Sequence, residues 1–160
     1  MGWRKDLEIA VGVRSLRLLQ FMYEKTDGRI GQRYGQWQFL LLRCKGRKTG
    51  KIRTVELLYI EDGDNVCVIG SKGGSDTPPA WLVNIQSNPD AEVQIGRDRW
   101  PAVARIADPK ERSRLWRKAN EVWDYDAYQR RSSREIPVII LEKAKAHQPR
   151  SAAAVRQNDH

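Results

Sequence analysis

The hydrophobic and polar positions along the chain predict a mixture of helices and hairpin-linked strands. Residues 6–24 have the apolar period of an amphipathic helix, which the Gly-rich stretch 25–36 ends. The runs that follow are of strand length and are separated by turn residues or by one cationic loop. The expected strands are 37–43, 51–60, 65–71, two strands within 91–107 around a turn at 96–98, and 135–142, which is apolar enough to be buried on both faces.

Two further helices are predicted between these strands. Thr77 is expected to cap a helix that runs to about residue 89 and holds two prolines in its first turn. Asp108 and Glu111 have the spacing of a capping box, which predicts a helix that runs to residue 123. Strands and helices do not alternate throughout, so the order favours an α+β domain on a curled antiparallel sheet, closed as a barrel, over a doubly wound parallel sheet.

The domain organisation follows from this pattern. At 160 residues the chain is expected to hold one core. We expect an N-terminal helix and linker over 1–34, the barrel domain over 35–142 and a disordered polar tail over 143–160. No run of eighteen apolar residues is present and acids occur early in the chain, so we expect a cytoplasmic protein without a secretory signal.

Positive charge is concentrated in the first third of the chain. The net charge is +9; residues 1–56 carry 13 Lys/Arg against 5 Asp/Glu, and residues 57–160 carry 16 against 15. Five of these cations lie in the stretch "CKGRKTGKIR" at residues 44–53. A positive face of this kind suits phosphates, polycarboxylates, nucleic acid or an anionic membrane.

The reactive residue types exclude several classes of enzyme. Both histidines, His147 and His160, lie in the polar tail, which argues against a Ser-His-Asp or Cys-His nucleophile and against a histidine metal site. Cys44 and Cys67 are too few for a zinc cage and are expected to be buried free thiols. Demanding chemistry would therefore require a bound organic cofactor.

The cationic loop does not fit a nucleotide-binding P-loop. Only three residues separate Gly46 from Gly50, and Ile52 follows Lys51 where that motif has Ser or Thr. The loop is either a nest for an anion or a hairpin tip kept soluble by its charge, and its own sequence leaves both open. A second stretch, "SKGGSDTPPAW" from residue 71, adds a lysine and two glycines at a strand end, where backbone can approach a flat or anionic ligand closely.

Four motifs in chain order resemble the deazaflavin-dependent nitroreductase family, whose members are also called deazaflavin-dependent quinone reductases. They are "GRKTG…R" at 46–53, "LLY…DGD" at 57–64, "SKGG…P.W..N…NP" at 71–89 and "Y..YQ…R.IP" at 125–138. The similarity covers roughly residues 15–142. It implies an antiparallel, flavin-reductase-like split β-barrel with flanking helices.

The resemblance also implies a cofactor and a reaction. The cofactor is coenzyme F-420, a deazaflavin joined to a phosphodiester and an oligoglutamate tail, with FMN as the less favoured choice. The reaction is hydride transfer to an electron-poor acceptor such as a quinone, a nitro compound or a conjugated enone. A ligand with a phosphate and several carboxylates matches the local positive charge, and its ring supplies chemistry that the chain lacks without histidine.

Site residues of three kinds are implied by the same resemblance. Contacts to the phosphate and tail are expected from Arg47, Lys48, Thr49 and Arg53. The segment under the ring and its supports are expected to be Ser71, Lys72, Gly73, Trp81 and Asn84. The catalytic residues implied are Tyr125 and Tyr128 on the acceptor side, together with Ser71 of the segment under the ring. A phenol there can donate a hydrogen bond to a carbonyl or nitro oxygen as hydride arrives.

The chain departs from its relatives beside the acceptor pocket, at Val55-Glu56, Leu58 and Val122-Trp123, which suggests a more apolar site. Other interpretations also remain. The protein could be a non-catalytic lipid- or cofactor-binding member of the fold, and the basic N-terminal helix could rest on an anionic membrane instead of packing on the barrel. Nucleic-acid binding is not expected, because most Trp residues lie in periodic apolar stretches. The sequence is compatible with a monomer or a homodimer.

Overall fold

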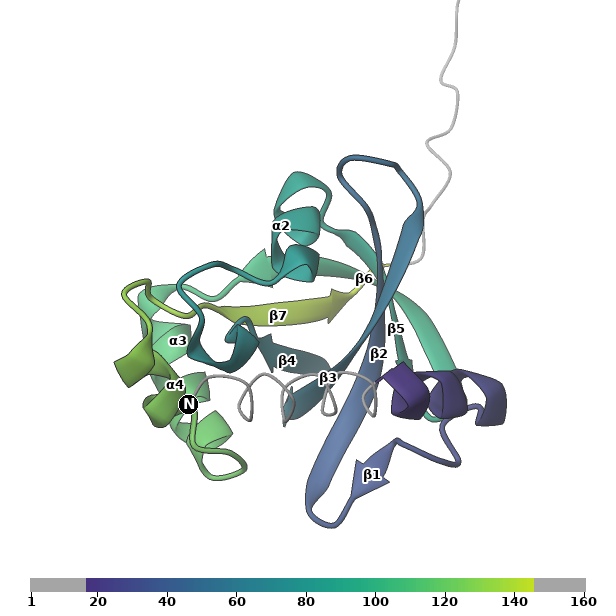
Figure 1. Cartoon of the computed structure of the whole chain (residues 1–160), viewed down its shortest axis with the longest axis horizontal. Coiled ribbons are helices and arrows are strands. Elements are labelled where there is room, and N and C mark those ends of the chain that lie inside the picture. The colour runs from purple at the N-terminus through teal and green to yellow at the C-terminus, as the bar shows by residue number, and fades with distance from the viewer. Residues whose placement is uncertain (1–16, 146–160) are drawn as a thin grey trace, which may run out of the picture.

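The computed structural model describes residues 17–145, and the structural statements below concern that range. Its antiparallel strands are hydrogen-bonded in the order β1-β2-β3-β4-β7-β6-β5, and β2 also pairs with β5. All strands except β1 therefore form a closed barrel (Figure 1). The strands are β1 (Arg33–Tyr34), β2 (Trp37–Lys45), β3 (Ile52–Asp62), β4 (Asn65–Ile69), β5 (Asp90–Ile95), β6 (Asp98–Ile106) and β7 (Val138–Lys143).

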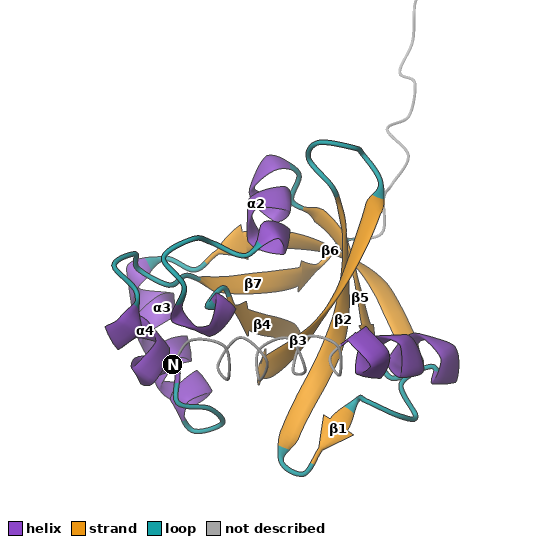
Figure 2. Cartoon of the chain, in the orientation of Figure 1, coloured by secondary structure: helices purple, strands orange, loops and turns teal. Residues whose placement is uncertain are grey.

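The helices flank this barrel (Figure 2). They are a helix that covers 17–26 in the described range, the 3-10 helix η1 (Lys72–Gly74), α2 (Ala80–Ser87), α3 (Pro109–Asn120) and α4 (Tyr125–Arg131). The expected α+β class and antiparallel barrel with flanking helices are confirmed. No helix within residues 17–145 has the length and apolar character needed to cross a bilayer.

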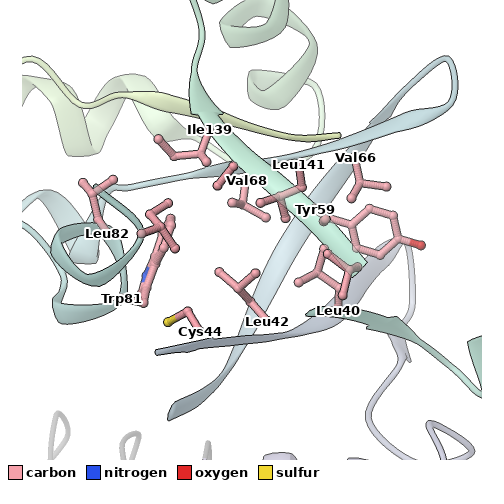
Figure 3. Close-up of a cluster of buried hydrophobic side chains, with 14 residues drawn as sticks. Leu40, Leu42, Cys44, Tyr59, Val66, Val68, Trp81, Leu82, Ile139 and Leu141 are labelled. Carbon is pink, nitrogen blue, oxygen red and sulfur yellow. The ribbon is translucent and has the colours of Figure 1, made fainter. Parts of the chain in front are cut away.

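Two hydrophobic clusters hold the fold together. One fills the barrel with alternate residues of its strands, such as Leu40 and Leu42 of β2, and Trp81 and Leu82 of α2 join it at one end (Figure 3). The other packs α3 and α4 against the outside of β4 and β7. Strand β7 serves both clusters, with Ile139 and Leu141 in the first and Ile140 in the second, so the expected burial on both faces is confirmed.

The N-terminal helix is fastened to the outside of the barrel by Tyr23. This side chain is fully buried, and its hydroxyl donates to Phe39 O at 3.1 Å and accepts from Gly96 N at 2.9 Å. Gln20 Nε2 adds a hydrogen bond of 3.3 Å to Thr54 O. The described part of this helix thus packs on the barrel, while residues 6–16 of the predicted helix lie outside the described residues.

The helix predicted to begin at Thr77 begins later in the structure. Thr77 does not cap α2, which begins at Ala80 with Pro79 at the N-cap position and no side-chain cap; two consecutive prolines keep the chain extended up to Pro79. The capping box of Asp108 and Glu111 is confirmed.

The segment predicted as one helix to residue 123 ends at Asn120. A separate helix, α4, then begins under the cap of Asp124, whose carboxylate accepts from Ala127 N at 2.9 Å. The sequence prediction missed α4, and it also missed the short elements β1 and η1. The domain boundaries at 34 and 142 stay predictions, and residues 146–160 of the expected tail lie outside the described residues.

Candidate functional site

A cavity of about 400 Å³ lies between the β2–β3 hairpin and the start of α2. Its size falls in the usual range of small-molecule sites. Six of the nine cofactor residues expected from the sequence line it, namely Arg47, Lys48, Thr49, Arg53, Trp81 and Asn84. The fold therefore brings together residues that are up to 37 positions apart in the chain.

The hairpin loop has a fixed backbone. Gly46 N donates to Lys51 O at 2.8 Å, and Gly50 N donates to Gly46 O at 2.8 Å. Gly50 has φ +69°, a left-handed conformation that favours glycine. These two bonds and the glycine conformation fix the turn from which the long cationic side chains extend.

The charges of these cations are not neutralised by acidic side chains of the described residues. Arg47, Lys48, Lys51 and Arg53 are exposed, and within residues 17–145 none of them forms a salt bridge. On the neighbouring strand, by contrast, Arg43 is paired with Glu92 at 3.0 Å. Like charges repel, so such a cluster is stabilised when an anion binds. This arrangement favours the anion-nest interpretation of the loop over the solubility interpretation.

The opposite wall of the cavity comes from α2. Asn84 is 6% exposed, and its Oδ1 accepts from Arg47 N at 3.1 Å and from Arg47 Nη1 at 3.4 Å. Trp81 is also buried and lies beside Cys44 in the barrel cluster (Figure 3). Trp81 thus belongs to the core and lines the cavity at the same time.

The cysteines are confirmed as buried free thiols. Burial raises the pKa of Cys44, and burial raises the pKa of Cys67 to about 12. Both side chains are therefore protonated at neutral pH, and neither has the thiolate character of a nucleophile. Within the described range there is also no cluster of residues able to hold a metal ion.

The remaining expected cofactor residues lie outside the cationic cavity. Ser71, Lys72 and Gly73 lie at the end of β4 and in η1, which contacts α4. Lys72 Nζ donates to Thr77 Oγ1 at 2.9 Å, within its own loop. A Cβ at Gly74 would lie 2.6 Å from Tyr128 O, so glycine at this position permits the close approach of α4.

The two expected catalytic tyrosines have different surroundings. Tyr125 is 6% exposed in the second hydrophobic cluster, and burial raises the pKa of its phenol. Tyr128 is half-buried, with its ring centroid 6.0 Å from that of Tyr125 and 6.3 Å from that of Trp123. Tyr128 is the more accessible of the two.

Sequence reasoning missed some residues of the cavity wall. Gly46, Thr54 and Ala80 also line it, and so does Val55, which the sequence had suggested beside the acceptor pocket instead. Val55 packs against the barrel cluster, as does Leu57 two positions later. The alternation of apolar residues in β3 was the signal that could have placed Val55 on the inner side.

Comparison with known proteins identifies the family. The sequence matches the family model described as F420H(2)-dependent quinone reductase over residues 15–143. The chain belongs to this family. An F420H(2)-dependent quinone reductase of Mycobacterium tuberculosis strain H37Rv is 42% identical over 142 residues, which cover 86% of this chain and 95% of that protein.

Solved structures agree with this assignment. An F420-H2 dependent reductase is 36% identical with a TM-score of 0.60, over 65% of this chain and 93% of that one. A structure described as a domain-swapped dimer is 32% identical with a TM-score of 0.64, over 83% and 98% respectively. The resemblance noted in the sequence is confirmed, and with it the split-barrel fold, the oxidoreductase class and coenzyme F-420 as the cofactor of the family.

Proposed function

We propose that this protein transfers hydride from reduced F-420 to a quinone, and that the cationic cavity binds the acidic part of the cofactor. Family membership supports the reaction class. One observation carries the site assignment. Three exposed cations, Arg47, Lys48 and Arg53, line a cavity whose wall also includes Trp81 and Asn84, and they form no salt bridge within residues 17–145.

The residues of this cavity suit the phosphodiester and oligoglutamate groups. The guanidinium groups of Arg47 and Arg53 can each donate two parallel hydrogen bonds to a phosphate or carboxylate. Lys48 adds a mobile point charge, and Thr49 adds a hydroxyl donor on the same wall. This part of the site supplies affinity and takes no part in proton or hydride movement.

The segment 71–73 is proposed to lie along the ring. Gly73 has φ +64°, and a Cβ built on it would meet nothing within 4 Å. Its backbone therefore borders open space that a flat ring can approach closely. Ser71, two positions before Gly73, is only 9% exposed, so it could act only on a ring in direct contact with it.

The acceptor is proposed to bind on the side of α4. When bound, reduced F-420 supplies two electrons and a proton as hydride, and a quinone needs one further proton to become the hydroquinone. The proposed donor of a hydrogen bond to the carbonyl oxygen on which negative charge develops is Tyr128, whose ring centroid lies 6.0 Å from that of Tyr125. Nitro compounds and conjugated enones are proposed as further acceptors, because their oxygen atoms develop charge in the same way.

Anaerobic mixing tests this proposal. Reduced F-420 is mixed with the protein and with a panel of quinones, nitroaromatics and enones, and its reoxidation is followed by absorbance. One cofactor reoxidised per menadione reduced, at a rate proportional to protein, is the expected result. Tight F-420 binding without turnover of any acceptor would instead favour the non-catalytic binding member.

The assembly state and location also remain proposals. The relative described as a domain-swapped dimer supports a homodimer, which light scattering during size exclusion would detect. Contact with an anionic membrane is supported by Leu18 and Phe21 of the N-terminal helix, which are 61% and 53% exposed. Flotation with phosphatidylglycerol vesicles, compared with neutral vesicles, would test that contact, and a protein that floats with neither would contradict it.

A further inference from the structure

We infer that Arg134 is a positioning residue that holds the 71–73 segment against α4 and so sets where the cofactor ring meets the acceptor. The inference rests on the proposed function. Arg134 lies between α4 and β7 and is half-buried. Its Nε donates to Ser75 O at 3.0 Å, and its Nη2 donates to Gly70 O at 2.8 Å and to Ser71 O at 3.1 Å.

The segment that Arg134 holds has an unfavourable backbone. Lys72, Gly73 and Gly74 have consecutive φ values of +46°, +64° and +82°. The left-handed region is unfavourable for a lysine, and residues in such conformations persist only where their surroundings fix them. The guanidinium bonds span this turn, from Gly70 before it to Ser75 after it, and so oppose its relaxation.

A second contact joins the same two segments. Asp76 Oδ1 accepts from Ser133 N at 2.7 Å and from Ser133 Oγ at 2.9 Å, and these bonds lower the pKa of the Asp76 carboxyl. The residues on either side of η1 are therefore tied to the chain that follows α4.

Arg134 is itself held in place by α3 and α4. Gln129 Nε2 donates to Arg134 O at 2.9 Å, and Gln129 Oε1 accepts from Ile136 N at 2.9 Å. Arg112 of α3 donates from Nη2 to Ile136 O at 2.8 Å. Arg134 is therefore anchored to the helix that carries Tyr125 and Tyr128, and it fixes segment 71–73 relative to that helix.

Arg134 lies apart from the cationic loop, so the alignment of the ring and the binding of the acidic tail can be disturbed separately. The cations at 47–53 lie on the β2–β3 hairpin and make no contact with Arg134 among the hydrogen bonds of the described residues. Loss of Arg134 should therefore disturb the alignment of ring and acceptor much more than it disturbs binding of the acidic tail. Small errors of alignment are known to cost large factors in rate.

The test compares Arg134→Gln and Arg134→Lys with the matched control Arg130→Gln. Arg130 is an exposed arginine at the end of α4 whose contact with Asp124 is 3.9 Å long. We expect kcat with menadione to fall by about tenfold or more in Arg134→Gln, with F-420 affinity changed by less than about threefold. Arg134→Lys should recover part of the rate, since it keeps one charged donor, and Arg130→Gln should match the wild-type protein.

Amide hydrogen exchange in the cofactor-free protein gives a readout that does not need turnover. Faster exchange at 70–76 in Arg134→Gln, with unchanged exchange at 46–53, is the expected result. Should Arg134→Gln fail to fold, Asp76→Ala is the second variant, and we expect the same local loss of protection. Unchanged kcat and unchanged exchange at 70–76, or equal loss of kcat and F-420 affinity, would overturn the inference. Absence of turnover in the wild-type protein would overturn the proposed function, and the exchange result would still decide whether Arg134 holds the segment.

Discussion

The backbone amide of Arg47 donates a hydrogen bond of 3.1 Å to Oδ1 of Asn84, across 37 residues of sequence. This bond joins the tip of the β2–β3 hairpin to α2 at the place where both line the cavity. The loop that carries the exposed cations is thereby held close to the wall that carries Trp81. Preorganisation of this kind lowers the cost of ordering the loop when a ligand binds.

Asn84→Ala should weaken both the fold and the site. Asn84 is 6% exposed, and its loss would leave the Arg47 amide without this acceptor, so we expect the free energy of unfolding to fall by about 1–2 kcal/mol. F-420 affinity should fall as well, because the loop would no longer be fixed. Urea unfolding and fluorescence titration measure the two effects, with the exposed Gln86→Ala on the same helix as control. Equal behaviour of the two variants would contradict the role given to Asn84.

Lys48→Ala and Arg53→Ala should each weaken F-420 binding by roughly tenfold at low ionic strength. Salt screens exposed charges, so the loss should shrink as salt is added. Lys51→Ala is the matched control, because Lys51 belongs to the same loop but does not line the cavity. Titration of tryptophan fluorescence at several salt concentrations measures these affinities. Equal losses in all three variants would mean that only net charge matters.

Tyr128→Phe should slow turnover more than Tyr125→Phe does. Tyr128 is half-buried whereas Tyr125 is 6% exposed, so the hydroxyl of Tyr128 is better placed to reach an acceptor. For a lost donor of this kind we expect kcat to fall by about tenfold to a hundredfold, with F-420 affinity unchanged. Steady-state kinetics with menadione provide the comparison. A larger effect at Tyr125, or none at either position, would remove the assignment of Tyr128.

Glu56 makes the stability of the protein depend on pH. Burial raises the pKa of its carboxyl from 4.5 to about 7, and its Oε2 has no hydrogen-bond partner within the described residues. As pH rises from 4.5 to 7 the unfolded carboxyl ionises while the folded one stays protonated, so stability falls across this window. Glu56→Gln has no carboxyl to ionise, so this variant should not lose stability across that pH window.

We therefore expect Glu56→Gln to be more stable than the wild-type protein at pH 8 by about 1–2 kcal/mol, after allowance for solvent screening of a partly exposed group. Near pH 4 this advantage should disappear, because the carboxyl is then neutral in both states. Urea unfolding at both pH values gives the comparison. Glu61→Gln, an exposed position on the same strand, is the control and should show no such change. If Glu56→Gln and the wild-type protein differed in stability by the same amount at both pH values, ionisation of Glu56 would not be the cause.

The sequence predicted elements well where one local signal was enough. The capping box at Asp108 and Glu111 and the apolar run of β7 both indicated the observed structure. Thr77 failed as a cap because the prolines that follow it keep the chain extended to Pro79. Helix α4 was missed because its seven residues are mainly polar and its only buried residue is Tyr125, which leaves no apolar period to detect.

The site was predicted less completely than the fold. Local composition marks the cationic, Gly-hinged turn at 46–53, whereas Trp81 and Asn84 of the cavity wall were implied by the family resemblance. The bonds of Arg134 to Ser75, Ser71 and Gly70 join positions 59, 63 and 64 residues apart, and η1 contacts α4 across a similar stretch of chain. Periodicity within one segment contains no information about such contacts. The same limit explains why Thr54 and Ala80 were not anticipated beside Lys48.

The most direct test of the account is a thermodynamic cycle between the cationic loop and the acidic tail. Affinities of the wild-type protein and of an Arg47→Ala/Lys48→Ala/Arg53→Ala variant are measured for F-420 and for the deazaflavin core without phosphodiester and oligoglutamate. We expect the wild-type protein to bind F-420 about a hundredfold or more tighter than it binds the core. The variant should lose most of this preference and bind the core as tightly as the wild-type protein does. If the variant keeps the full preference for F-420, the acidic tail binds elsewhere and the central claim is wrong.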